Sequence, residues 1–126
     1  MPAADYGKNY RLLTPGDFKA VFDDVNWKAS TQLLTALCKK NSSNNARLGV
    51  IISKKNYRLA VQRNRIKRLI RESFRHDRDK MDGLDIVVLV RKGFQDVDNR
   101  TVTEQLTKLW KRLQRNVQKS QNGSQA

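Results

Sequence analysis

Apolar residues recur along the chain at two different spacings, which predict helices in some segments and strands in others. The segments with apolar residues three and four positions apart, as on one face of a helix, are 15–24, 60–75 and a last one that follows Asp98. The continuous, partly β-branched runs that are typical of strands are 32–39, 47–53 and 84–91. The order α-β-β-α-β-α predicts a single α+β domain in which helices pack on a small sheet.

Local signals set the limits of these elements. Thr14 can cap the first helix, and Asp17 lies where a carboxylate favours a helix N-terminus. The polar run 41–45 predicts a turn, so that the first two strands form a hairpin. We expect the domain to span residues 1–117 and residues 118–126, which are poor in apolar side chains, to form a disordered tail.

Positive charge is concentrated in one part of the sequence. The chain has 126 residues and a formal net charge of +14 at pH 7. No acidic residue occurs between Asp24 and Glu72, whereas that interval contains twelve Lys or Arg residues. Such charge favours a polyanionic partner, nucleic acid first and an anionic membrane second. Because the interval keeps its apolar periodicity, the charge belongs to a folded surface rather than to a tail.

The predicted helix at 60–75 has two different faces. Stepping about 100° per residue places these apolar residues in one arc: Leu59, Ile66, Leu69, Ile70 and Phe74. Arg68, Arg71 and Arg75 fall on the opposite side, and arginine makes planar, two-pronged contacts with phosphate. This face therefore predicts salt-sensitive binding of a polyanion. The alternative is that these arginines are only solvated charges on a helix surface. The shortage of acidic partners nearby argues against it.

The residues in and around this helix resemble a known family. The run AVQRNRIKRLIR at 60–71 resembles the RNR motif of the bacterial ribonuclease P protein component. The resemblance continues through GVIISKK at 49–55 and, in order and spacing, covers residues 9–115. It implies the protein subunit of the ribonucleoprotein that removes the 5′ leader from precursor tRNA. It also implies that the catalytic groups and Mg²⁺ ions of this endonuclease belong to its RNA subunit.

The resemblance implies two partners, the catalytic RNA and the leader of precursor tRNA, and requires no protein partner. It places these residues against the catalytic RNA: Arg63, Asn64, Arg65, Lys67, Arg68, Arg71, Lys54 and Lys55. It further implies a left-handed crossover between the strands at 47–53 and 84–91, whereas general chirality predicts a right-handed one.

A cleft between the first helix and the sheet, which receives the single-stranded leader, is also implied by the resemblance. Phe18 and Phe22 match leader-contacting positions, where an exposed ring can stack on a base of any sequence. Their spacing fits packing in the core as well. Leu34 and Ala36 line the same cleft if the strand register turns them toward the helix.

Three other functions fit parts of the sequence. A ribosomal-type RNA-binding protein would share the charge and architecture without assembling into an enzyme. A protein-only nuclease would need a histidine pair or a carboxylate cluster, but His76 is the only histidine. Four acidic residues that follow it match no metal-loop spacing, namely Asp77, Asp79, Asp82 and Asp85. A membrane-surface binder would need exposed apolar residues opposite its charged face. In this chain we expect those apolar residues to pack on the sheet.

The cysteine content and the distribution of apolar residues indicate the cellular compartment. Cys38 is the only cysteine, so a disulfide framework is excluded and a reducing compartment fits. No basic segment followed by an apolar run opens the chain, and no apolar stretch has the length of a membrane span. We therefore expect a soluble, cytoplasmic protein, and the sequence identifies no residues in it that would hold a cofactor or a metal ion.

Overall fold

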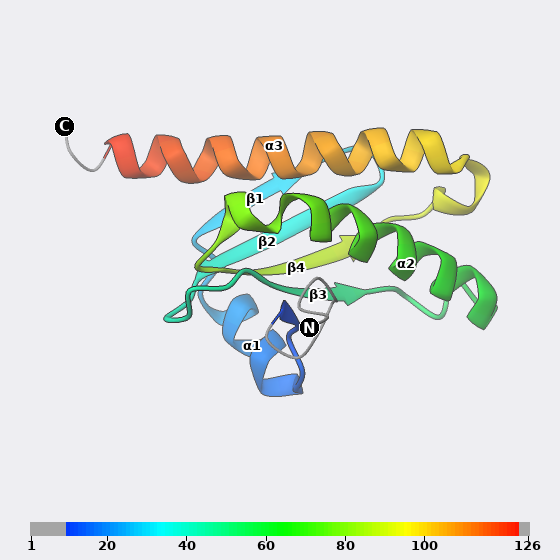
Figure 1. Cartoon of the computed structure of the whole chain (residues 1–126). Coiled ribbons are helices and arrows are strands. Elements are labelled where there is room, and N and C mark those ends of the chain that lie inside the picture. The colour runs from blue at the N-terminus through cyan, green and yellow to red at the C-terminus, as the bar shows by residue number, and fades with distance from the viewer. Residues whose placement is uncertain (1–9, 124–126) are drawn as a thin grey trace, which may run out of the picture.

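The structure, a computed structural model, describes residues 10–123, which form one α+β domain as predicted (Figure 1). In chain order its elements, with η denoting short 3-10 helices, are α1 (Pro15–Asp23), β1 (Trp27–Ser30), β2 (Leu34–Lys40), β3 (Arg47–Ile51), α2 (Ala60–Asp77), η2 (Arg78–Met81), β4 (Leu84–Val90), η3 (Phe94–Asp96) and α3 (Asn99–Gly123).

The four strands form one mixed sheet in the order β1-β2-β4-β3. β2 pairs antiparallel with both β1 and β4, whereas β3 pairs with β4 in parallel. The hairpin expected between β2 and β3 is wrong, because β4 lies between them. The turn at 41–45 does reverse the direction of the chain. It leaves a gap of one strand between β2 and β3, and β4 occupies that position. β1 is an additional strand that the apolar pattern did not predict, since only Ala29 of its four residues is buried.

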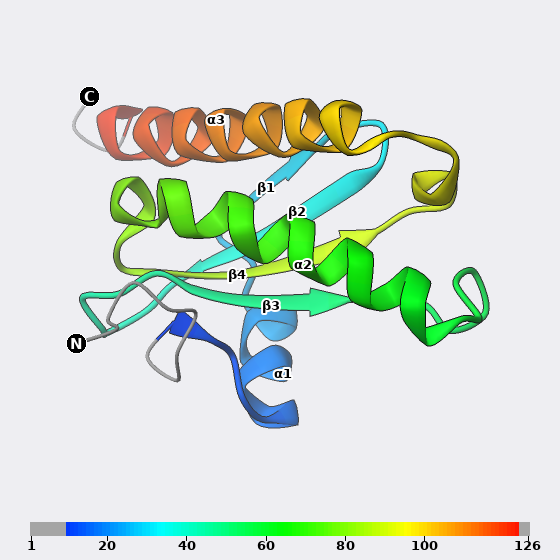
Figure 2. The same ribbon diagram turned by 45° about the vertical axis from the view of Figure 1, so that its right-hand side comes forward.

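Helices cover the two faces of the sheet unequally. α2 and α3 lie side by side on one face, and the smaller α1 lies on the other (Figures 1 and 2). The main core lies under α2 and α3, and a smaller one, built on Leu12, Val21 and Val87, lies under α1. In Figure 2, β3 and β4 run from left to right, α2 passes in front of them, and β4 lies above β3. The β3–α2–β4 crossover is therefore left-handed, as the resemblance implied.

The helix limits follow local chemistry. At α1, the Thr14 hydroxyl accepts a hydrogen bond from the Asp17 amide, and the Asp17 carboxylate accepts one from Thr14, which completes a capping box. At α3, Asp98 accepts a hydrogen bond from the Thr101 amide at 2.8 Å. α3 continues to Gly123, so the disordered tail expected for residues 118–126 is wrong over 118–123, while 124–126 lie outside the described residues.

Candidate RNA-binding surfaces

α2 attaches to the sheet through one apolar stripe. Ile66, Ile70 and Phe74 are buried, as the spacing predicts, and Leu69 is partly buried. Leu59, placed on the same face by the sequence, is instead 58% exposed because it precedes the first helical turn. The stripe fixes the rotation of α2 and therefore turns its other side toward solvent.

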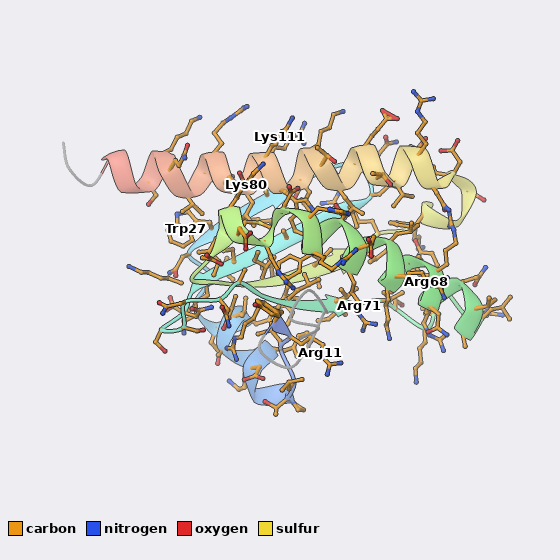
Figure 3. The ribbon with its side chains drawn as sticks, in the orientation of Figure 1. Arg11, Trp27, Arg68, Arg71, Lys80 and Lys111 are labelled. Atoms are coloured by element: carbon orange, nitrogen blue, oxygen red, sulfur yellow. The ribbon has the colours of Figure 1, made fainter. Side chains whose placement is uncertain are left out.

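The outward side of α2 carries cations with little compensation from acidic groups. Asn64 and Arg68 are exposed, and Lys67 and Arg71 are partly exposed. Figure 3 labels two of these residues, Arg68 and Arg71, which lie on neighbouring turns of the helix. Glu72 is the one acidic residue before the last turn, and its carboxylate accepts a hydrogen bond from Arg75 at 2.6 Å, which lowers its pKa. We call this surface the α2 cationic face.

Two of the arginines predicted to bind RNA also have structural partners. Arg63 donates to the carbonyl oxygens of Tyr57 at 2.7 Å and Arg58 at 2.9 Å, and so it fixes the segment that enters α2. Arg65 donates to the Asn99 side chain at 2.7 Å and to the Val97 carbonyl at 2.9 Å. Arg65 therefore joins α2 to the start of α3. These partners, which lie up to 34 residues away, were not evident from the sequence.

Lys54 and Lys55 extend the α2 cationic face beyond the helix. Both are exposed in the turn between β3 and α2. The Ser53 hydroxyl accepts a hydrogen bond from the Lys55 amide at 3.2 Å, which fixes this turn next to the end of β3. The structure thus brings the predicted lysines to the segment that leads into α2.

The α1 side of the sheet is apolar and partly exposed. Val21 is buried there, Phe18 packs partly buried beside it, and Phe22 is 44% exposed. Gly49 of β3 makes room for Phe18: a Cβ atom at Gly49 would lie 2.4 Å from Phe18 Cε1. Of the two predicted leader contacts, Phe22 therefore offers an accessible ring, whereas Phe18 is held against the sheet.

The placement of Leu34 and Ala36 beside α1 is wrong. Both are fully buried in the main core, on the face that α2 and α3 cover. Because side chains alternate along a strand, the β2 residues on the α1 side are Thr35 and Leu37. Leu37 is partly buried in the smaller core, next to Leu89 of β4. We call the set Phe18, Phe22, Leu37 and Leu89 the α1 apolar face.

Two polar groupings on the α1 side were not identified from the sequence. The Arg91 guanidinium donates to the Thr35 hydroxyl at 3.1 Å, beside the α1 apolar face. Farther along, Arg47 binds the buried carboxylate of Asp85 through two hydrogen bonds of 2.8 and 2.6 Å, which raise the pKa of Arg47. The alternation of side chains along β3 and β4 could have placed Arg47 and Asp85 on this face. It could not have shown that the two residues pair.

The described residues present neither a reactive thiol nor a cluster of metal ligands. Burial raises the pKa of the Cys38 thiol to about 12, so it is neutral at physiological pH and not a nucleophile. Within residues 10–123 no three His, Cys, Asp or Glu side chains come together as a possible metal site. No helix in that range is long and apolar enough to cross a membrane.

A sheet with a cationic helix on one side and accessible aromatic and apolar groups on the other is typical of an RNA-binding protein. Comparison with known proteins agrees. The family model described as Ribonuclease P matches residues 6–114. The ribonuclease P protein component of Pseudomonas aeruginosa is 45% identical over 126 residues, covering 100% of this chain and 93% of that protein. That of Azotobacter vinelandii is 49% identical over 115 residues, covering 91% and 88%.

Solved structures give the same answer. The RNase P protein of Thermotoga maritima matches with a TM-score of 0.71 and 34% identity, covering 83% of this chain and 96% of that one. That of Staphylococcus aureus matches with a TM-score of 0.75 and 28% identity, covering 81% and 93%. The chain belongs to the ribonuclease P protein family, the protein components of a tRNA-processing endoribonuclease that partner its RNA subunit.

Proposed function

We propose that the chain divides its work between the two faces of its sheet. The α2 cationic face, with Lys54 and Lys55, docks on the RNA subunit, and the α1 apolar face holds the 5′ leader of precursor tRNA. The observation that carries this division is the placement of the two surfaces on opposite sides of one sheet, with no residue in common (Figure 2).

Docking on the RNA subunit is electrostatic. Arginine forks pair with phosphate oxygens, and each contact releases counterions from the RNA. Arg68 supplies such a fork without a described protein partner, whereas Arg63 and Arg65 combine phosphate binding with their hydrogen bonds to the protein. Asn64, exposed between the latter two, adds a neutral donor and acceptor.

Leader binding rests on stacking rather than charge. The Phe22 ring is accessible to an unpaired base, and stacking tolerates any base sequence. Arg91, hydrogen-bonded to Thr35 at the edge of the same face, is placed for a phosphate of the strand. Because mature tRNA has no leader, these contacts favour the substrate over the product.

Catalysis belongs to the RNA subunit in this proposal, and Mg²⁺ would be held there. The chain contributes indirectly, since cations that screen the phosphates reduce the Mg²⁺ concentration that the RNA requires. We propose that it acts in the cytoplasm, where its buried, unpaired Cys38 fits a reducing environment.

The experiment is cleavage of a 5′-extended precursor tRNA at low Mg²⁺ by the RNA subunit alone, the protein alone and both together. Cleavage at the mature 5′ end that requires both supports the proposal. Cleavage by the protein alone would contradict it. Tight binding of the RNA subunit with no gain in cleavage would place the chain instead among ribosomal-type RNA-binding proteins.

A pair of variants tests the division of labour. Arg65→Ala combined with Arg68→Ala should weaken assembly with the RNA subunit, because it removes two guanidinium groups from the α2 cationic face. Phe22→Ala should weaken precursor binding by the assembled enzyme and leave assembly intact, because Phe22 belongs to α1, which lies on the other face of the sheet. Equal effects of both variants on assembly would refute separate surfaces.

A further inference from the structure

A pocket of about 400 Å³ lies where η2 and the start of β4 meet the C-terminal half of α3. Its apolar lining includes the half-buried ring of Trp27 together with Met81 and Val117. Figure 3 shows Trp27 and Lys80 toward one end of the sheet and Arg68 of the α2 cationic face toward the other. Pockets of roughly 300–1,000 Å³ accept small planar ligands, and a nucleobase fits this volume.

The rim of the pocket is polar. Lys40 and Lys80 are both exposed, and Lys80 Nζ lies 3.9 Å from the Asp77 carboxylate, beyond hydrogen-bond distance. Gln114 and Gln118 of α3 add amide groups, which donate and accept. Asp82 disfavours a phosphate on its side but can accept a hydrogen bond from the amino group of a base. This set of groups suits an unpaired nucleotide.

The exposed side of α3 beside the pocket is basic. Residues 105–126 contain no acidic residue and five basic ones, namely Lys108, Lys111, Arg112, Arg115 and Lys119. Spacings of three and four residues place the five on one side of the helix, and all are exposed. None of them takes part in an ion pair within the described part of the chain. We call them the α3 basic stripe.

Uncompensated charge next to an aromatic pocket points to single-stranded RNA rather than to a protein or a lipid surface. Phosphates are attracted to the stripe at any sequence, and an indole ring binds whichever base is turned out of the strand. An anionic lipid surface would need large apolar groups projecting from the stripe. The positions next to its cations instead carry exposed polar side chains such as Thr107 and Gln118.

We propose that the pocket receives one unpaired nucleotide of the RNA subunit, whose backbone follows the α3 basic stripe. The base stacks on Trp27, with the amides of Gln114 and Gln118 at its edge, and Lys40 and Lys80 neutralise the flanking phosphates. The proposal rests on the proposed function only for the identity of the RNA.

The RNA subunit is favoured over the leader by position. α2 and α3 cover the same face of the sheet, whereas the α1 apolar face lies on the other (Figure 2). An RNA that docks on the α2 cationic face therefore reaches α3 without passing around the sheet. A leader bound beside α1 would have to cross the edge strand.

Tryptophan fluorescence of the full chain tests the stacking. Trp110 is fully buried, so Trp27 is the indole that an RNA base can reach. Adding the RNA subunit should quench emission in the wild type, and Trp27→Phe should abolish that quenching. Quenching that persists in Trp27→Phe would overturn the proposal. Quenching by precursor tRNA alone but not by the RNA subunit would overturn the choice of RNA.

A matched pair of charge reversals tests the rim without touching the ring. Lys80 and Arg100 are both exposed, and each lies near one carboxylate three or four residues away in the sequence, at 3.9 and 3.7 Å. Lys80→Glu should weaken binding of the RNA subunit about tenfold more than Arg100→Glu, since only Lys80 borders the pocket. Circular dichroism checks that both variants are folded.

Equal losses of affinity for the RNA subunit in these two variants would refute nucleotide binding in the pocket. This failure is distinguishable from failure of the proposed function. If the wild-type chain does not stimulate cleavage of precursor tRNA, the proposed function is wrong whatever Trp27 does. If it does stimulate cleavage while Lys80→Glu binds like Arg100→Glu, only the nucleotide pocket is wrong.

Discussion

The α2 cationic face and the α1 apolar face, on opposite sides of one sheet, differ in what binding would demand of them. Charges on α2 act through solvent over about 10 Å at moderate salt, so they tolerate variation in how RNA approaches. Phe22 and the partly buried Leu37 and Leu89 act only in contact, and depend on how α1 is seated. Attachment can thus be robust while recognition of a strand remains sensitive to small displacements.

The largest expected effect is a loss of stability of the sheet, which supports both faces. Asp85 is 5% exposed and accepts hydrogen bonds from Arg47 and, at 2.8 Å, from the Asn41 side chain. Asp85→Ala removes the acceptor of these hydrogen bonds and should lower the free energy of unfolding by about 2–3 kcal/mol. The expected loss of stability is moderate because the Arg47 side chain is 29% exposed, so that water can solvate its charge. Urea denaturation measures it.

The matched control for this variant is Asp79→Ala, at an exposed position of η2. It should change the free energy of unfolding by no more than about 0.5 kcal/mol. Equal effects of the two substitutions would mean that the Asp85 network does not hold β3 to β4.

A smaller effect should be confined to the α1 side. Gly49→Ala would place a Cβ atom 2.4 Å from Phe18 Cε1, so the ring must move. We expect a loss of about 1–3 kcal/mol in stability and weaker precursor binding, with docking on the RNA subunit unchanged. Gly49 has no positive φ, so backbone strain plays no part.

Two variants sharpen this test. Gly16→Ala adds a Cβ in ordinary contact, 3.6 Å from the Thr14 hydroxyl, and should be tolerated. Replacing Phe18 with Leu in the Gly49→Ala background should restore part of the stability by relieving the clash. Absence of any rescue would show that the Gly49–Phe18 contact is not the cause.

The α1 helix should also make the stability of this face depend on pH. Hydrogen bonds from the Leu13 amide at 2.8 Å and the Thr14 amide at 3.1 Å lower the pKa of Asp17. Its contribution is therefore present above the unfolded pKa of about 3.9 and is lost as the pH falls through the lower folded value.

Asp17→Asn measures that contribution. At pH 7 it should cost about 1 kcal/mol in urea unfolding, because the capping box is weakened. The difference from the wild type should shrink as the pH is lowered below about 4. A difference that stays constant down to pH 2 would contradict a role for the ionised carboxylate.

The smallest effect on stability is expected from Arg68→Ala, and it should be visible only in RNA binding. Arg68 is exposed on the α2 cationic face, so the free energy of unfolding should change by less than about 0.5 kcal/mol. Binding to the RNA subunit should lose about one unit of its logarithmic salt dependence. Arg100→Ala serves as the control, and an identical salt dependence in both would remove Arg68 from the interface.

Elements with local signals were predictable from the sequence, and their partners were not. The cap at Thr14, the apolar stripe of α2 and the buried face of α3 depend on neighbours within a few residues, and the structure confirms them. The pairing of β4 between β2 and β3 depends on segments more than thirty residues apart, and the turn at 41–45 suggested a hairpin instead.

The same distinction holds for the two surfaces. The cations of the α2 face follow from the spacing within one helix, but the hydrogen-bond partners of Arg65, the Val97 carbonyl and the Asn99 side chain, lie just before and at the start of α3. Leu34 and Ala36 were assigned to the wrong side because the sequence does not fix which alternate set of β2 faces α1. The α3 basic stripe was not predicted, because outside the interval between Asp24 and Glu72 the 14 basic residues are nearly balanced by 12 acidic ones.

The inner position of β4 has a consequence for synthesis of the chain. β4 is the last strand to leave the ribosome, yet β2 and β3 both pair with it. Until it emerges, each of these strands has an unpaired edge, which is a template for association with another chain. Both edges lie in the interval between Asp24 and Glu72, which contains no acidic residue. We therefore expect mutual repulsion between nascent chains to oppose such association.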